Sequence, residues 1–142
     1  MDANLNMVGP AIALGLSCIG SAVGCSIAGM ASHGAMSRVE EGHGKFIGMS
    51  AAPSSQAIYG FILMLMMSGA IDKGMSAYTG IAVGIFSGLA IMISAIYQGK
   101  CAATAIQASV KKPAIFGKCF AAIGIVESFA LFAFVFAIMI LK

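Results

Sequence analysis

The feature that most limits the fold of this chain is a series of four long apolar segments. They cover residues 8–36, 46–71, 78–109 and 119–141 and are separated by short polar stretches. A helix needs about 20 mostly apolar residues to cross the hydrocarbon core of a bilayer. Of the 142 residues, 60% are hydrophobic and 9% charged, so little is left to fold in water. We therefore predict an all-α membrane protein with four transmembrane helices. Any nucleotide chemistry is expected from a partner, so the chain itself is not expected to be an enzyme.

One ionisable side chain, Glu127, lies inside the last apolar segment. A charged side chain at the centre of a bilayer costs about 2.5 to 3.5 kcal/mol on insertion scales, and such residues usually mark ion pathways. Glu127 is therefore predicted to be the working residue. The alternative is a passive polar contact with a neighbouring helix.

The two halves of the chain repeat. A shift of 73 residues pairs Gly15-Leu16 with Gly88-Leu89 and Ser21-Ala22 with Ser94-Ala95. Roughly a dozen identities occur in this register, which indicates a duplicated helical hairpin. We predict one hairpin in residues 1–72 and a second in residues 73–142. Only the second carries the membrane carboxylate.

The second apolar segment is interrupted by a polar group around Pro53. Proline removes a helical hydrogen bond and frees backbone oxygen atoms nearby. Ser55, Gln56 and Tyr59 follow at a spacing that places them on one side of the helix. These residues are candidates for an ion site. The alternative is a proline kink whose polar side chains join helices.

Three polar side chains are predicted at one depth in the membrane. Measured from the nearest loop lysine, Glu127 lies about 14 Å, Gln56 about 16 Å and Gln98 about 20 Å along its helix. The hydrocarbon core is about 30 Å thick, so all three lie near its middle and can meet.

Together these groups offer a carboxylate, two amide oxygens, a hydroxyl and a backbone carbonyl. Such oxygen atoms suit a hard cation, so the sequence favours Na⁺ over a transition metal. A buried carboxylate can instead be neutralised by a proton. The expected cargo is Na⁺, with protons competing at low pH, and no organic cofactor is expected.

Basic residues are concentrated in two of the three connections. An excess of Lys and Arg marks the cytoplasmic side of a membrane protein, so both hairpin loops are predicted in the cytoplasm and both termini outside. The net charge of +3 comes from loop residues and does not indicate nucleic-acid binding. The loop residues are Arg38, Lys45, Lys111, Lys112 and Lys118; Lys73 and Lys142 lie on the other side.

Three segments together resemble the proteolipid of V/A-type ATPases, a duplicated four-helix protein of the rotor that is often named K or c. They are PSSQAIYG at 53–60, QGKCAATAIQ at 98–107 followed by KKP at 111–113, and VESFALF at 126–132. The resemblance extends over all four predicted helices. It implies a multi-pass protein of a bacterial or archaeal plasma membrane.

In the Na⁺-pumping members, the resemblance implies an ion site on defined positions of this chain. Ser55 stands where those members have Thr, and Ala52 replaces a larger aliphatic residue. Tyr59 is implied to hold the carboxylate by a hydrogen bond. The implied Na⁺ ligands are Glu127, Gln98, Gln56, Ser55 and the backbone carbonyl of Ala52.

The resemblance also implies partners. Copies of the chain are expected to form an oligomeric ring that turns against a stator membrane subunit with a buried Arg and is joined to central-stalk subunits. The ring is expected to exchange ions for ATP hydrolysis or synthesis. Two functional alternatives are the same rotor carrying H⁺ only and an oligomeric ion channel not coupled to ATP. A third is a purely structural helix-packing protein.

Overall fold

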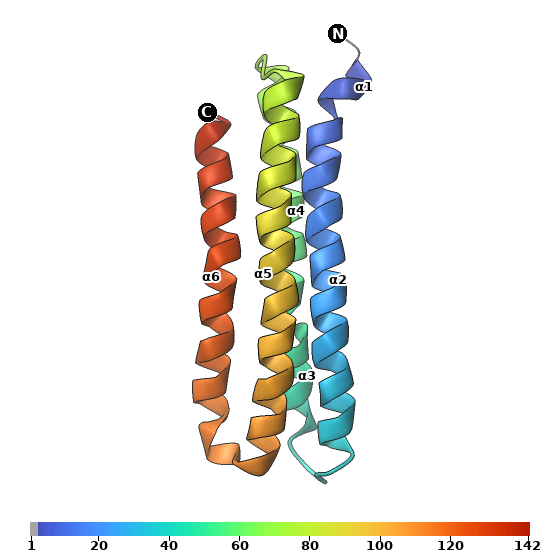
Figure 1. The fold of residues 1–142 in the computed structure, drawn as a ribbon, viewed down its shortest axis with the longest axis vertical. Coiled ribbons are helices and arrows are strands. Elements are labelled where there is room, and N and C mark those ends of the chain that lie inside the picture. Colours follow the sequence, from blue (N-terminus) through green and yellow to red (C-terminus); the bar gives the residue numbers. More distant parts are fainter. Residues whose placement is uncertain (1–2) are drawn as a thin grey trace.

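The computed structural model describes residues 3–142, which form a bundle of long helices standing side by side (Figure 1). Four helical spans are long and apolar enough to cross a membrane, which confirms the predicted fold class. The described residues form helices and turns, and no strand is found among them. The elements are α1 (Ala3–Asn6), α2 (Val8–Met36), α3 (His43–Ala51), η1 (Ala52–Ser54), α4 (Ser55–Asp72), α5 (Ala77–Lys111), η2 (Pro113–Ile115) and α6 (Phe116–Ile140).

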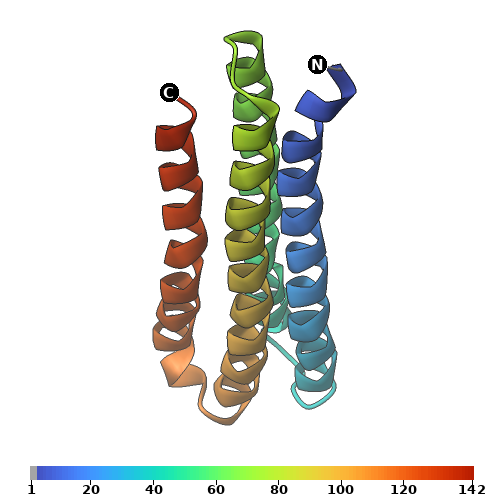
Figure 2. The same ribbon diagram turned by 45° about the horizontal axis from the view of Figure 1, so that its top comes forward.

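The connections alternate between the two ends of the bundle. The α2–α3 and α5–α6 connections lie at one end, and the two termini lie with the α4–α5 connection at the other (Figures 1 and 2). Two turns depend on glycine, because Gly42 and Gly74 have φ angles of 79° and 98°. L side chains rarely adopt such angles. The chain can therefore reverse within a few residues.

The second membrane span is broken where Pro53 was expected to interrupt it. The interruption is a single 3₁₀ turn, η1, between α3 and α4. The backbone N–H of Ala52 donates to the carbonyl of Met49, and the N–H of Ser55 donates to the carbonyl of Ala52. Because proline has no N–H, the backbone changes from i–4 to i–3 bonding around it. The 3₁₀ turn thus changes the direction in which the side chains of the following residues point.

The last connection is shorter than the sequence suggested. We expected residues 110–118 to link the helices, but α5 continues to Lys111 and α6 begins at Phe116. Between them lies the turn η2, which has Pro113 at its start. Proline is accommodated in the first turn of a helix because the N–H it lacks has no partner there. Pro113 therefore starts the next helical segment instead of lengthening the loop.

The apolar core is divided by a polar layer. One cluster of buried residues lies near the hairpin loops and includes Ala28, Met49 and Ile123. The other lies near the termini and includes Ala13, Leu63 and Ala130. The buried amides of the predicted site come between these clusters along α4 and α5. The candidate site is thus enclosed by apolar packing on both sides.

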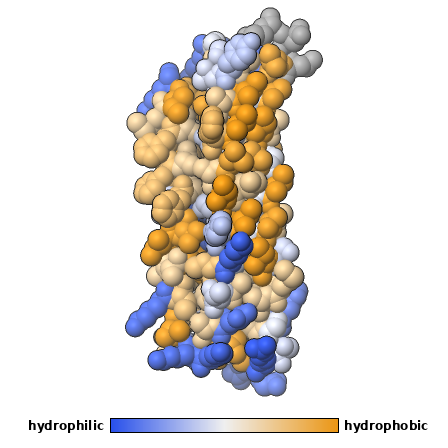
Figure 3. All heavy atoms as spheres, in the orientation of Figure 1, coloured by the Kyte–Doolittle hydropathy of each residue, from blue (hydrophilic) through white to orange (hydrophobic). Residues whose placement is uncertain are grey.

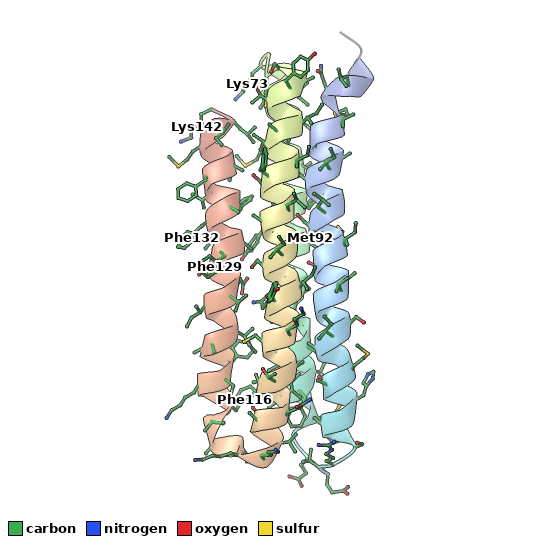
Figure 4. The ribbon with its side chains drawn as sticks, viewed as in Figure 1. Lys73, Met92, Phe116, Phe129, Phe132 and Lys142 are labelled. Atoms are coloured by element: carbon green, nitrogen blue, oxygen red, sulfur yellow. The ribbon has the colours of Figure 1, made fainter. Side chains whose placement is uncertain are left out.

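Helix α2 packs closely against α5, whereas α6 is largely exposed. A methyl group added at Gly99 would overlap the backbone of Gly24, so the two helices touch through their backbones. On α6, Phe129 and Phe132 are 65% and 54% exposed, and both are labelled on this outer helix in Figure 4. A broad apolar surface covers the middle of the face seen in Figure 3, with hydrophilic residues concentrated toward its ends. Such a belt suits a lipid environment or contact with other membrane helices.

Candidate ion-binding site

The candidate site joins three helices at the polar layer. Gln56 lies in the first turn of α4, Gln98 in α5, and Glu127 in α6. Both glutamines are fully buried, whereas Glu127 is partly buried. The three side chains that the sequence places at one depth therefore meet in the structure.

Both oxygens of the Glu127 carboxylate accept hydrogen bonds. The Tyr59 hydroxyl donates to Oε1 at 2.8 Å, and Nε2 of Gln98 donates to Oε2 at 3.3 Å. The carboxylate is therefore tied to α4 and to α5 at once. Because the two hydrogen bonds come from different helices, together they fix the direction of the carboxylate.

The glutamine amides extend the network away from Glu127. Gln56 donates from Nε2 to Oε1 of Gln98 at 2.7 Å. The Ser55 hydroxyl lies 3.1 Å from Oε1 of Gln56 and 3.1 Å from the carbonyl oxygen of Ala52. The structure thus brings together all six residues that the sequence singled out. The Ala52 carbonyl reaches the network through Ser55, which donates to it from both its N–H and its hydroxyl.

Further residues hold this network in place and were not found from the sequence. The Ser94 hydroxyl donates to the carbonyl of Val126 at 2.9 Å, and Nε2 of Gln98 lies 3.3 Å from the carbonyl of Ile123. The Phe134 ring stacks on Tyr59 with centroids 5.6 Å apart. Ser94 lies four residues before Gln98, and this helical spacing was the signal available.

The atoms that the site could offer to a cation are mostly oxygens, from a carboxylate, two amides and a hydroxyl. In residues 3–142, no group of three or more His, Cys, Asp or Glu side chains is placed to hold a metal ion. Oxygen ligands of this kind are those that a hard cation prefers, and a carboxylate can also take up a proton.

Lys100 does not belong to this site. It is exposed, and its Nζ lies 4.6 Å from the centroid of the Tyr97 ring. A cation over an aromatic face is stabilised electrostatically. Gln98, two residues earlier in α5, points instead into the buried network.

Comparison with known proteins identifies the family. The family model of the ATP synthase C-subunit matches this chain twice, at residues 8–67 and 81–140. This chain belongs to the ATP synthase C-subunit family. The matched segments begin 73 residues apart, the shift at which the halves of the sequence align. Proteins of this family are non-catalytic, ion-translocating components of rotary ATPases, and the resemblance to a V/A-type proteolipid is confirmed.

Two relatives of this chain are K subunits of rotary ATPases. The A-type ATP synthase subunit K of Methanocaldococcus jannaschii is 31% identical over 137 residues, which are 96% of this chain and 61% of that protein. The V-type sodium ATPase subunit K of Enterococcus hirae is 32% identical over 134 residues, which are 86% of this chain and 80% of that protein. The chain thus spans about three-fifths of the archaeal relative.

Proposed function

We propose that this chain is the rotor-ring proteolipid of a V/A-type ATPase and carries Na⁺ on Glu127. The observation that best supports this is the Glu127 carboxylate, held by Tyr59 and Gln98 at the edge of a buried polar layer. Soluble subunits of the complex hydrolyse or synthesise ATP. Rotation of the ring couples that reaction to ion movement.

The charge of Glu127 controls rotation. An empty, ionised carboxylate enters lipid only at a high cost in free energy, whereas a carboxylate neutralised by Na⁺ or a proton enters easily. The ring therefore turns past lipid only when its sites are loaded. Each unit charge that crosses 100 mV is worth about 2.3 kcal/mol. With one such carboxylate per four helices, a ring of given girth moves few ions per turn, which suits pumping against a steep gradient.

The ring is built from copies of the two hairpins, residues 1–72 and 73–142. The closely packed α2 and α5 line its inside, and α4 and α6 form its outside, because the exposed aromatic rings of α6 suit lipid and the stator. A stator subunit with a buried Arg displaces the ion from Glu127. Central-stalk subunits bind the hairpin loops. These loops face the cytoplasm of a bacterium or archaeon. Lys73 and Lys142 lie at the opposite end of the bundle (Figure 4), which faces the outside of the cell.

The choice of Na⁺ over H⁺ rests on the groups around the carboxylate. A proton needs only Glu127, whereas a cation also needs neutral oxygen ligands. Ser55, Gln56 and Gln98 supply such oxygens within one hydrogen-bonded network. The relative from Enterococcus hirae is named as a subunit of a sodium ATPase, which agrees with this choice.

The test is protection of Glu127 from a carbodiimide by Na⁺. Membranes containing the complete ATPase are labelled over a range of Na⁺ concentrations at fixed pH, and the label on Glu127 is measured by mass spectrometry. Na⁺ is expected to suppress labelling, with K⁺ at equal ionic strength as the control. Labelling that depends on pH but not on Na⁺ would establish the H⁺ rotor instead. Ion flux through the purified chain without partners would support the channel.

The Tyr59→Phe variant is expected to bind Na⁺ more weakly. It loses the hydroxyl that donates to Glu127 at 2.8 Å, and a hydrogen bond to a charged group contributes about 1.5 to 3 kcal/mol. The Na⁺ concentration for half-protection should therefore rise by about ten- to 100-fold. The matched control is Tyr97→Phe, which changes an exposed tyrosine and should leave this concentration unaltered. Equal values for both variants would contradict the role given to Tyr59.

A further inference from the structure

One buried polar side chain next to the candidate site has no partner. Ser21 on α2 is 6% exposed, and its Oγ makes no hydrogen bond in the structure. An unpaired hydroxyl in an apolar interior is destabilising. One turn earlier, the buried Ser17 donates to the carbonyl of Ala13 in its own helix at 2.7 Å. Ser21 does not use this local bond, so its hydroxyl is available to a neighbouring helix.

The packing of α2 against α4 puts Ser21 opposite Gln56. A methyl group added at Gly60 would overlap the side chain of Ser17, and one added at Gly24 would lie 2.8 Å from Cβ of Pro53. The helices run in opposite directions (Figure 1), so a step forward on α2 matches a step back on α4. Ser21 lies one turn after Ser17, and Gln56 lies one turn before Gly60.

Gln56 has an unused donor at the same place. A glutamine amide carries two N–H groups, and Nε2 of Gln56 gives one of them to Oε1 of Gln98. The side-chain hydrogen bonds of residues 3–142 include no partner for the second. By contrast, Nε2 of Gln98 has two acceptors, the carbonyl of Ile123 and the carboxylate of Glu127. Of the two buried amides, Gln56 is thus the one whose orientation is incompletely fixed.

The repeat explains why the Ser21 hydroxyl is free. In the 73-residue register Ser21 corresponds to Ser94, and Pro53 corresponds to Val126. Ser94 donates to the carbonyl of Val126 and so links α5 to α6. In the first hairpin the matching position lies in the 3₁₀ turn η1, where the backbone follows a different path. Ser21 has no such bond to α4, and the register of the two helices places Gln56 opposite it.

We propose that Ser21 is a positioning residue of the ion site. When the site binds its ion, the Oγ of Ser21 accepts the second N–H of Gln56 and so turns Oε1 of Gln56 toward the ion on Glu127. All four membrane-spanning segments then contribute to the site. The inference rests on the proposed function and adds α2 to the three segments already described.

The Ser21→Ala variant tests this assignment in membranes that contain the complete ATPase. It is expected to raise the Na⁺ concentration for half-protection of Glu127 by about two- to tenfold, the change expected for one neutral hydrogen bond. The matched control is Ser17→Ala, which removes a hydroxyl that is bonded within its own helix. Ser17→Ala should not change the half-protection concentration. Equal values for Ser21→Ala and Ser17→Ala would overturn the inference.

A double variant separates positioning from general packing. If Ser21 acts through Gln56, Ser21→Ala should have no further effect on Na⁺ protection once Gln56 is replaced by Leu, because the two changes remove one interaction. An undiminished effect of Ser21→Ala in the Gln56→Leu background would show that Ser21 acts elsewhere and would overturn the inference.

The outcome for the wild-type ring separates this inference from the proposed function. If Na⁺ protects wild-type Glu127 but Ser21→Ala equals Ser17→Ala, only the role of Ser21 fails. If Na⁺ does not protect wild-type Glu127, the Na⁺ proposal fails. The same two variants are then compared by the pH of half-maximal labelling, which Ser21 still influences through Gln56 and Gln98. Equal midpoints in that experiment overturn the inference for a proton-carrying ring as well.

Discussion

Replacing Glu127 with Gln is expected to abolish ATP-driven ion transport while the ring still assembles. The amide has nearly the shape of the carboxylate, and its oxygen can still accept a hydrogen bond from Tyr59. It has no negative charge to balance a cation and cannot take up a proton at neutral pH. Loss of one partner of a buried ion pair costs about 3 to 5 kcal/mol, so ion binding should fall by at least about 100-fold. The measurement is ATP-driven ²²Na⁺ uptake into vesicles containing the complete ATPase.

The control for Glu127→Gln is Asp72→Asn, which neutralises an exposed carboxylate at the end of α4, away from the hairpin loops. Asp72→Asn should transport at the wild-type rate. The amount of assembled ring in detergent is compared for both variants, so that a folding defect is not mistaken for a transport defect. Sustained Na⁺ uptake by a properly assembled Glu127→Gln ring would mean that Glu127 does not carry the ion. If Glu127→Gln left every activity of the complex unchanged, the chain would be a purely structural helix-packing protein.

Much of the fold follows from the sequence because a membrane allows few solutions. Backbone groups in lipid must be paired within helices, so an apolar segment of sufficient length can be assigned without knowing its neighbours. The span 8–36 agrees with α2 at both ends. Two helices begin three residues earlier than predicted: α3 at His43 instead of residue 46, and α6 at Phe116 instead of residue 119. The sequence suggested a loop around Pro113, but proline there starts a helical turn.

The members of the candidate site follow from depth, but their hydrogen bonds do not. Counting residues from the loops placed Glu127, Gln56 and Gln98 at one level because every helix rises by the same length per residue. The direction of each amide depends on its rotamer and on the carbonyls that face it. The sequence therefore did not indicate that Gln98 would donate to both Ile123 and Glu127. It also did not single out Ser21, since a serine in a helix commonly bonds to its own backbone.

The distribution of packing in the bundle agrees with what a rotor site requires. The side chains of Gln56 on α4 and Gln98 on α5 are fully buried. Glu127 comes from α6, whose other faces carry exposed aromatic side chains, and is only partly buried. The proposed neutral ligands are thus enclosed by the protein, while the proposed charged ligand lies where a stator could reach it. An exchangeable ion needs this combination, because a carboxylate buried as deeply as the two amides would be hard to empty.

Substituting Gly24 with Ala is expected to destabilise the ring strongly. The new Cβ would overlap the carbonyl oxygen of Ala95 and lie 2.8 Å from Cβ of Pro53. Backbone and proline cannot move as a flexible side chain can, so relief requires separation of α2 from α5. Overpacking of this kind typically costs about 1 to 3 kcal/mol. The measurement is thermal unfolding of the detergent-solubilised ring, and Gly24→Leu should yield no assembled ring.

The control is Gly29→Ala on the same helix, where a new Cβ would meet nothing within 4 Å in the protomer. Alanine also favours a helix more than glycine does, so Gly29→Ala should be neutral or stabilising. Equal stability of the two variants would contradict the close approach of α2 to α5. Because Gly24 touches Pro53, whose 3₁₀ turn leads directly into Ser55 and Gln56, Gly24→Ala should also weaken Na⁺ protection of Glu127. A variant that lost stability without losing Na⁺ affinity would show that the turn positions the ion ligands independently of α2.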